Sequence, residues 1–101
     1  MREERIRRKD ALEVLRRYKH EFDRQYGVTA LGVFGSIARD EGTKSSDVDV
    51  VVKMREPDLF SLVHIKETLE DAFHGRVDIV HYRDRMNAFL KNRIDRDAVY
   101  V

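Results

Sequence analysis

The sequence predicts an α/β fold, built as a small mixed β-sheet of three or four strands with helices on one face. Short apolar runs rich in β-branched residues cover residues 30–34, 48–53 and 77–82, and they have the length of buried strands. Around them, residues 9–26 and 57–74 carry apolar side chains at helical spacing. Strand-like and helix-like segments therefore alternate along the chain, which is typical of a sheet covered by helices.

Size and composition indicate one domain spanning residues 1–101. The 20 basic and 19 acidic residues give a formal net charge of +1, which argues against direct binding of nucleic acid. The chain has no cysteine, so disulfides and thiolate metal sites are excluded. No apolar run reaches membrane-spanning length and the first residues do not resemble a signal peptide, so we expect a cytoplasmic protein.

Residues 9–26 are predicted to form an amphipathic helix that ends at Gly27, since glycine readily takes the left-handed conformation that follows a helix. Ile6 falls outside the apolar stripe of this helix and is a candidate contact for a partner protein. The basic residues are mixed with acidic ones, which indicates a solvated face rather than an RNA-binding one. The predicted buried stripe consists of Ala11, Leu12, Leu15, Tyr18, Phe22 and Tyr26.

The strand at residues 30–34 ends at Gly35, and Ser36 is predicted to cap a short helical turn. Free backbone N–H groups at the start of a helix bind phosphate, so this turn is a candidate phosphate site. A polar loop over residues 40–46 leads to the second strand. The two strands are joined by too little chain for a helical crossover, so we expect them to pair antiparallel in a mixed sheet.

Pro57 and Asp58 are predicted to start a second long helix, which runs to about His74 and stops at Gly75. Phe60 points away from its apolar stripe and is another candidate contact for a partner. The predicted buried stripe consists of Leu59, Leu62, Val63, Ile65, Leu69, Ala72 and Phe73.

A third helix and a short edge strand over residues 98–101 are predicted to complete the fold. Asp84 is expected to cap this helix, because a carboxylate can accept a hydrogen bond from a free N–H of the first turn. The residues expected to face the core are Met86, Phe89, Leu90 and Ile94.

Three acidic residues interrupt strands that are otherwise apolar. Side chains alternate across a strand, so Asp47 and Asp49 should point to the same side, and Asp78 breaks the next apolar run in the same way. A carboxylate without a partner is costly in such a place, whereas Mg²⁺ is commonly held by one or two carboxylates and substrate phosphates. We expect the three carboxylates to lie close enough to share a metal and, without it, to raise at least one of their pKa values.

Gly35-Ser36, a spacer of ten residues, Asp47-Val48-Asp49 and the later Asp78 together resemble the nucleotidyltransferase superfamily of the DNA polymerase β type. The spacer length is similar to that of the minimal nucleotidyltransferases. The resemblance implies that Asp47 and Asp49 hold a Mg²⁺ or Mn²⁺ ion on the triphosphate of ATP. It also implies a second ion held with Asp78, which activates an acceptor hydroxyl, and phosphate binding by Gly35 and Ser36.

Arg39 lies three residues after Ser36, on the same face of a helical turn. It is a candidate nucleotide-binding residue that stabilises the leaving pyrophosphate, and a structural ion pair with Asp40 or Glu41 is an equal alternative. Contacts from residues 44–46 to phosphate are less favoured than a solvated loop. We assign no role to any of the four histidines.

The resemblance further implies an antitoxin whose partner is a helical toxin of the HEPN family, and in some relatives AMP is attached to a tyrosine of that toxin. Three functions remain open. The chain is an enzyme that modifies its partner, a non-catalytic antitoxin that acts by occlusion, or a nucleotidyltransferase with a small-molecule acceptor. The last would need a further domain or a dimer. The sequence does not decide the nucleotide, the acceptor, or whether the protein forms homo-oligomers or hetero-oligomers.

Overall fold

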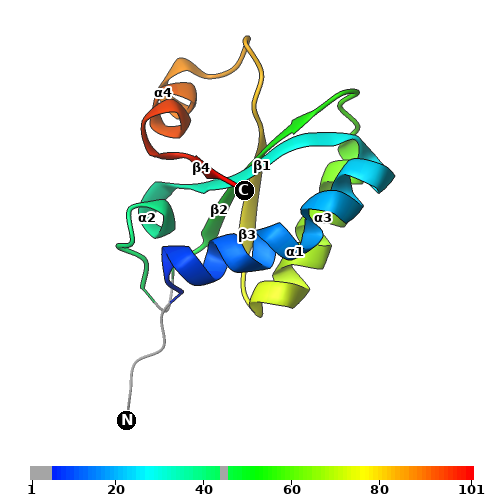
Figure 1. The fold of residues 1–101 in the computed structure, drawn as a ribbon. Helices are drawn as coiled ribbons and strands as arrows, with labels where there is room; N and C mark the ends of the chain where they lie inside the picture. The colour runs from blue at the N-terminus through cyan, green and yellow to red at the C-terminus, as the bar shows by residue number, and fades with distance from the viewer. Residues whose placement is uncertain (1–5, 44–45) are drawn as a thin grey trace.

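The computed structural model describes residues 6–43 and 46–101 (Figure 1). Within these ranges the chain forms a four-stranded sheet, and no helix there is long and apolar enough to span a membrane. In chain order the elements are α1 (Arg8–Tyr26), β1 (Val28–Phe34), α2 (Gly35–Ala38), β2 (Val48–Met54), α3 (Leu59–Phe73), β3 (Val77–His81), α4 (Ala88–Asp97) and β4 (Val99–Tyr100).

The strand order is β3-β2-β1-β4, and the sheet is mixed as predicted. β1 and β2 pair antiparallel, and their register places Phe34 opposite Asp49. β2 and β3 pair parallel through the crossover helix α3, with Asp49 opposite Asp78. β4 pairs antiparallel with β1 at the edge of the sheet, which confirms the predicted C-terminal edge strand.

The main core lies on the face of the sheet that α1 and α3 cover (Figure 1). Alternation along β2 points Val48, Val50 and Val52 at these helices, and all three are fully buried. The largest side chains that α1 and α3 bury in this core are Leu15, Phe22, Ile65 and Leu69. The predicted α/β fold class and the apolar stripe of α1 are therefore confirmed.

The opposite face of the sheet carries a second, smaller cluster under α4. Phe34, Val51 and Ile94 are buried there. The prediction of helices on one face is thus correct for α1 and α3 and wrong for α4. The physical reason is that Phe34 and Val51 point away from α1 and α3, so without α4 their apolar surface would face water.

The ends of α1 and α3 follow the predictions with one exception. Gly27 ends α1 in the left-handed conformation with φ 72°, and the Asp58 carboxylate caps α3 by accepting a hydrogen bond from the Phe60 N–H. The left-handed residue after α3 is His74, with φ 55°, and not Gly75. The prediction of Gly75 as the stop is therefore one residue late, because the turn forms at a residue that tolerates this conformation at some cost.

α4 begins later than the sequence suggested. Asn87 is its cap, and the Asn87 side chain accepts a hydrogen bond from the Leu90 N–H at 3.0 Å. The prediction of Asp84 as the cap is wrong, because the intervening residues form a bend before the helix starts. Asp84 instead offers its backbone carbonyl to the Lys91 ammonium at 3.3 Å.

Several apolar side chains differ from their predicted burial. Leu59 and Val63 of α3 are 73% and 45% exposed, and Phe89 of α4 is 79% exposed, so these three do not belong to the core. Phe60 is 76% exposed and does point away from the core, as predicted. Ile6 packs against the main core, so the idea of a free contact residue there is wrong. The buried stripes of α3 and α4 are therefore narrower than predicted.

Candidate active site

The Gly-Ser turn joins the end of β1 to the single helical turn α2. Gly35 has a φ of 75°, and a Cβ atom at this position would collide with the Asp49 carboxylate. Glycine is therefore required twice, for its backbone conformation and for the space it leaves to Asp49. The prediction of Ser36 as the helix cap is wrong. Phe34 occupies the cap position without a side-chain hydrogen bond, since Gly35 itself begins the helical turn.

Asp49 and Asp78 form the centre of the candidate site. They lie opposite each other on β2 and β3, on the same side of the sheet as Phe34 and Val51. Burial and the nearby charge of Asp78 raise the pKa of Asp49, and Asp47 adds a smaller effect in the same direction. This confirms the prediction that one of the three acids has a raised pKa, although burial is the larger cause and crowding of like charges the smaller.

Asp47 lies just before β2 and turns toward Arg76, with 3.4 Å between the Arg76 Nε and the Asp47 carboxylate. Among the described residues, no three acidic, histidine or cysteine side chains gather closely enough to hold a metal ion. In this arrangement only Asp49 and Asp78 lie side by side, and the sharing of a metal by all three carboxylates stays a prediction. Repulsion between like charges and the attraction of Arg76 draw Asp47 aside.

The donor set nevertheless fits a hard divalent cation. Asp49 and Asp78 supply carboxylate oxygens from adjacent strands, and Asp47 can join them because its ion pair is exposed and weak. Mg²⁺ and Mn²⁺ prefer such oxygen ligands and complete their coordination with water and phosphate oxygens. A cation between these acids would also remove the repulsion that raises the pKa of Asp49.

Arg39 makes two ion pairs. Its guanidinium contacts Glu41 at 3.0 Å, which is one of the predicted alternatives, and Asp97 at 2.7 Å, which the sequence analysis missed. The Asp97 side chain is only 5% exposed and is also held by Arg96. Hydrogen bonds from Arg96 and Arg39 hold the pKa of Asp97 below its usual range. The end of α4 is thereby tied to the residues that follow the Gly-Ser turn.

Arg93 of α4 is a second residue that the sequence analysis missed. Its guanidinium carbon lies 5.7 Å from the centre of the Phe34 ring, and its charge lowers the pKa of Asp49, against the effect of Asp78. The only signal in the sequence is its position next to Ile94, which was expected to face the core.

Of the predicted loop contacts, residues 44–45 lie outside the described residues. The Ser46 hydroxyl accepts a hydrogen bond from the Thr43 N–H at 2.9 Å.

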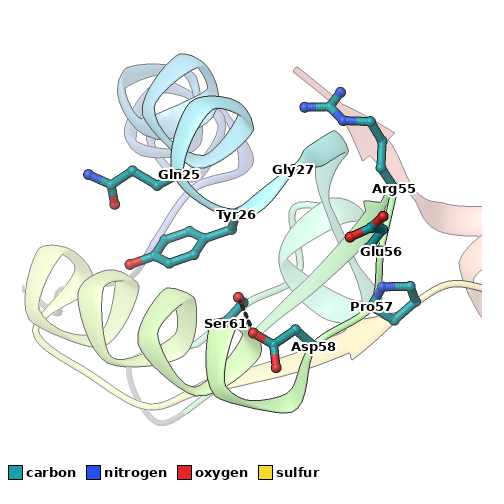
Figure 2. Close-up of a pocket in the computed structure, with 8 residues that line it drawn as sticks. All are labelled: Gln25, Tyr26, Gly27, Arg55, Glu56, Pro57, Asp58 and Ser61. Carbon is teal, nitrogen blue, oxygen red and sulfur yellow. Dashed lines mark hydrogen bonds between the residues drawn. The ribbon is translucent and has the colours of Figure 1, made fainter.

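A hollow of about 600 Å³ lies at the other end of β2, between the end of α1 and the start of α3 (Figure 2). In its lining, Ser61 donates a hydrogen bond of 2.8 Å to the Asp58 carboxylate, and Arg55 forms an ion pair with Asp23. Because Asp49 lies near the start of β2, this hollow is at the far end of the strand from the acids, of which Asp78 is exposed. The lining residues are Gln25, Tyr26, Gly27, Arg55, Glu56, Pro57, Asp58 and Ser61.

Comparison with known families shows what this combination of turn, acids and sheet represents. The family model described as "Polymerase beta, Nucleotidyltransferase" matches residues 17–101, which include every residue of the candidate site. The chain belongs to this nucleotidyltransferase family. The predicted family and enzyme class are therefore confirmed.

Curated relatives match nearly the whole chain. Protein adenylyltransferase MntA of Thermococcus cleftensis is 35% identical over 89 residues, which cover 87% of this chain and 89% of the relative. A protein of Methanocaldococcus jannaschii, provisionally named as a protein adenylyltransferase, is 33% identical over 90 residues, which cover 88% and 92% of the two chains.

Solved structures have the same fold. A protein provisionally described as a minimal nucleotidyltransferase is 33% identical, has a TM-score of 0.68, and shares 87% of this chain and 93% of its own. A toxin–antitoxin structure with AMP-PNP has 18% identity, a TM-score of 0.68, and coverages of 83% and 69%. A complex of a tri-AMPylated HEPN toxin of Shewanella oneidensis with its MNT antitoxin has 16% identity, a TM-score of 0.62, and coverages of 88% and 70%.

The collision between a Cβ at position 35 and Asp49 predicts a specific stability defect. Gly27→Ala should cost about 1–2 kcal/mol of unfolding free energy, since Gly27 has a similar positive φ but leaves room for a methyl group. Gly35→Ala should cost roughly 1–3 kcal/mol more, because the Asp49 carboxylate must move. Denaturant unfolding measures both, and adding Asp49→Ala to Gly35→Ala should recover the extra loss. Equal costs for the two glycines would contradict the close approach.

The raised pKa of Asp49 predicts how stability depends on pH. The folded chain binds the Asp49 proton more tightly than the unfolded chain, so this stabilisation is present at low pH and is lost as pH rises through the raised pKa. Asp49→Asn should therefore raise the melting temperature at pH 7 in metal-free buffer, and the gain should shrink below about pH 4, where carboxyls protonate. Asp71→Asn, on the exposed side of α3, is the control. A lower melting temperature for Asp49→Asn at pH 7 would refute the assignment.

Proposed function

We propose that this protein transfers AMP from ATP to a hydroxyl group of a partner protein, with the help of Mg²⁺ or Mn²⁺. We further propose that it acts in the cytoplasm as the antitoxin to a helical toxin of the HEPN family. The observation that carries the proposal is the Asp49–Asp78 pair beside Gly35, in a chain of the polymerase β nucleotidyltransferase family. Paired carboxylates next to a glycine turn are suited to a metal-bound triphosphate.

In this proposal Asp47, Asp49 and Asp78 hold the divalent cation. When bound, the metal neutralises the triphosphate and lowers the pKa of the acceptor hydroxyl. Gly35 leaves space for the phosphates to approach the backbone, and the Ser36 hydroxyl and N–H are available to donate hydrogen bonds to them.

In the transfer step one bond forms and one bond breaks. The acceptor oxygen attacks the α-phosphorus of ATP, a new O–P bond forms, and the bond to the β-phosphate oxygen breaks to release pyrophosphate. The hydroxyl proton goes to the carboxylate of Asp78, which is the more exposed of the two paired acids.

The choice of ATP and of a protein acceptor rests on the comparisons. The relatives are named protein adenylyltransferases, one similar complex contains AMP-PNP, and another contains an AMPylated toxin. The geometry agrees, because Asp78 is exposed and the hollow lies at the far end of β2. An acceptor must be positioned for fast transfer, and a docked partner protein would provide that positioning.

The proposal predicts AMP transfer in a purified complex with the partner. Incubation with ATP and Mg²⁺ should add AMP mass to the partner, and Asp49→Asn should slow the addition by at least about 100-fold, because several kcal/mol of charge stabilisation are lost. Intact-protein mass spectrometry measures the addition, and Asp71→Asn is the matched control.

Other outcomes identify the alternative functions. If the partner is inhibited without any gain of mass, and Asp49→Asn inhibits it equally well, the antitoxin acts by occlusion. If AMP appears only on a small hydroxyl compound when such compounds are supplied, the acceptor is a small molecule.

A further inference from the structure

Arg93 is placed at the edge of the candidate site by the packing of α4. The next residue, Ile94, is fully buried in the cluster with Phe34 and Val51, which fixes the rotation of α4 about its axis. The Arg93 guanidinium lies over the Phe34 ring, 5.7 Å from its centre, in a cation–π contact. Phe34 directly precedes Gly35 and is paired with Asp49 on β2.

Arg93 has no ion pair, although acidic groups are close. Within residues 6–43 and 46–101 its guanidinium donates no hydrogen bond and forms no salt bridge. By contrast, Arg39 is bound to Glu41 and Asp97, and Arg96 to Asp97. The ring that Arg93 covers belongs to Phe34, which is paired with Asp49, so the guanidinium lies near the acids. Arg93 is partly buried, and with respect to the described part of the chain the N–H donors of its guanidinium are unpaired beside the acids.

We propose that Arg93 is a phosphate-binding residue of this site and that its guanidinium contacts the triphosphate of the bound nucleotide. This inference rests on the proposed function. A triphosphate brings several negative charges to a place that already holds carboxylates, so a cation is needed besides the metal. Guanidinium groups bind phosphate oxygens in a planar, two-pronged geometry.

Arg39 is the competing candidate from the sequence, and its contacts give it a different task. To bind phosphate it would have to release Glu41 and Asp97, and the Asp97 carboxylate is almost completely covered. Arg93 has no carboxylate partner among the described residues, so it needs only to leave the Phe34 ring. In this assignment Arg39 ties α4 to the chain after the Gly-Ser turn, and α4 in turn holds Arg93 over the site.

The test is calorimetric binding of ATP, and of inorganic tripolyphosphate as a probe without a nucleoside, to the full chain with Mg²⁺. Arg93→Gln should weaken both by about 10- to 100-fold, the range expected for a lost charge-assisted hydrogen bond. Arg93→Lys should weaken binding less than Arg93→Gln does, because lysine keeps the positive charge but lacks the paired N–H donors of the guanidinium. Arg16→Gln, at an exposed arginine of α1 outside this network, is the matched control and should bind as the wild type does.

Melting temperatures keep the result interpretable. If Arg93→Gln fails to fold, Arg93→Lys decides: several-fold weaker binding of tripolyphosphate at an unchanged melting temperature supports the proposal, and wild-type binding overturns it. Wild-type binding by a folded Arg93→Gln, with loss in Arg39→Gln or Asp49→Asn, overturns the role of Arg93 and leaves the proposed function intact. If the wild type binds neither probe with Mg²⁺, the proposed function and this role both fail.

Discussion

The parallel pairing of β2 with β3 is the constraint on which the candidate site depends. It places Asp49 opposite Asp78, and this register is fixed by the apolar residues around them rather than by the acids. Val48 and Val50 must face α1 and α3, so Asp49 between them must face the other way. A slip of one residue would turn the acids into the core and the valines out of it. Burial of the valines in the main core therefore holds the two carboxylates next to each other despite their repulsion.

The second face of the sheet completes the site through α4. The antiparallel register of β1 and β2 brings Phe34 and the Gly-Ser turn next to Asp49, and α4 packs on that side because Phe34 and Val51 need cover. Once α4 is seated, Asp97 reaches Arg39 and Arg93 reaches the Phe34 ring. Packing of an apolar cluster thus delivers the basic groups that balance the acids.

Much of this arrangement could be predicted from the sequence because it depends on local patterns. Alternation along residues 48–53 correctly places Asp49 on the face opposite Val48, Val50 and Val52, and the short connection correctly predicts antiparallel β1 and β2. The roles of His74, Asn87 and Asp97 could not be predicted. Several neighbouring residues can end or cap a helix, so the sequence does not show which one does. Arg39, which pairs with Asp97, lies 58 positions away from it in the chain.

The position of Asp47 was beyond sequence analysis for a related reason. Strand alternation predicts the side on which a residue points only within the strand, and Asp47 precedes β2 and meets Arg76 instead. Likewise, helical periodicity indicated an apolar face on α4 without showing that this face would cover the acid side of the sheet, so Arg93 had no visible role.

The most direct test of the central claim is a double-mutant cycle on unfolding free energy with Asp49→Asn and Asp78→Asn in metal-free buffer at pH 7. If the strands hold the two carboxylates together, Asp49→Asn should stabilise the wild type more than it stabilises Asp78→Asn, because one substitution already removes the repulsion. Strictly additive effects of the two substitutions would show that the charges do not interact, and would contradict the pairing from which the site is built.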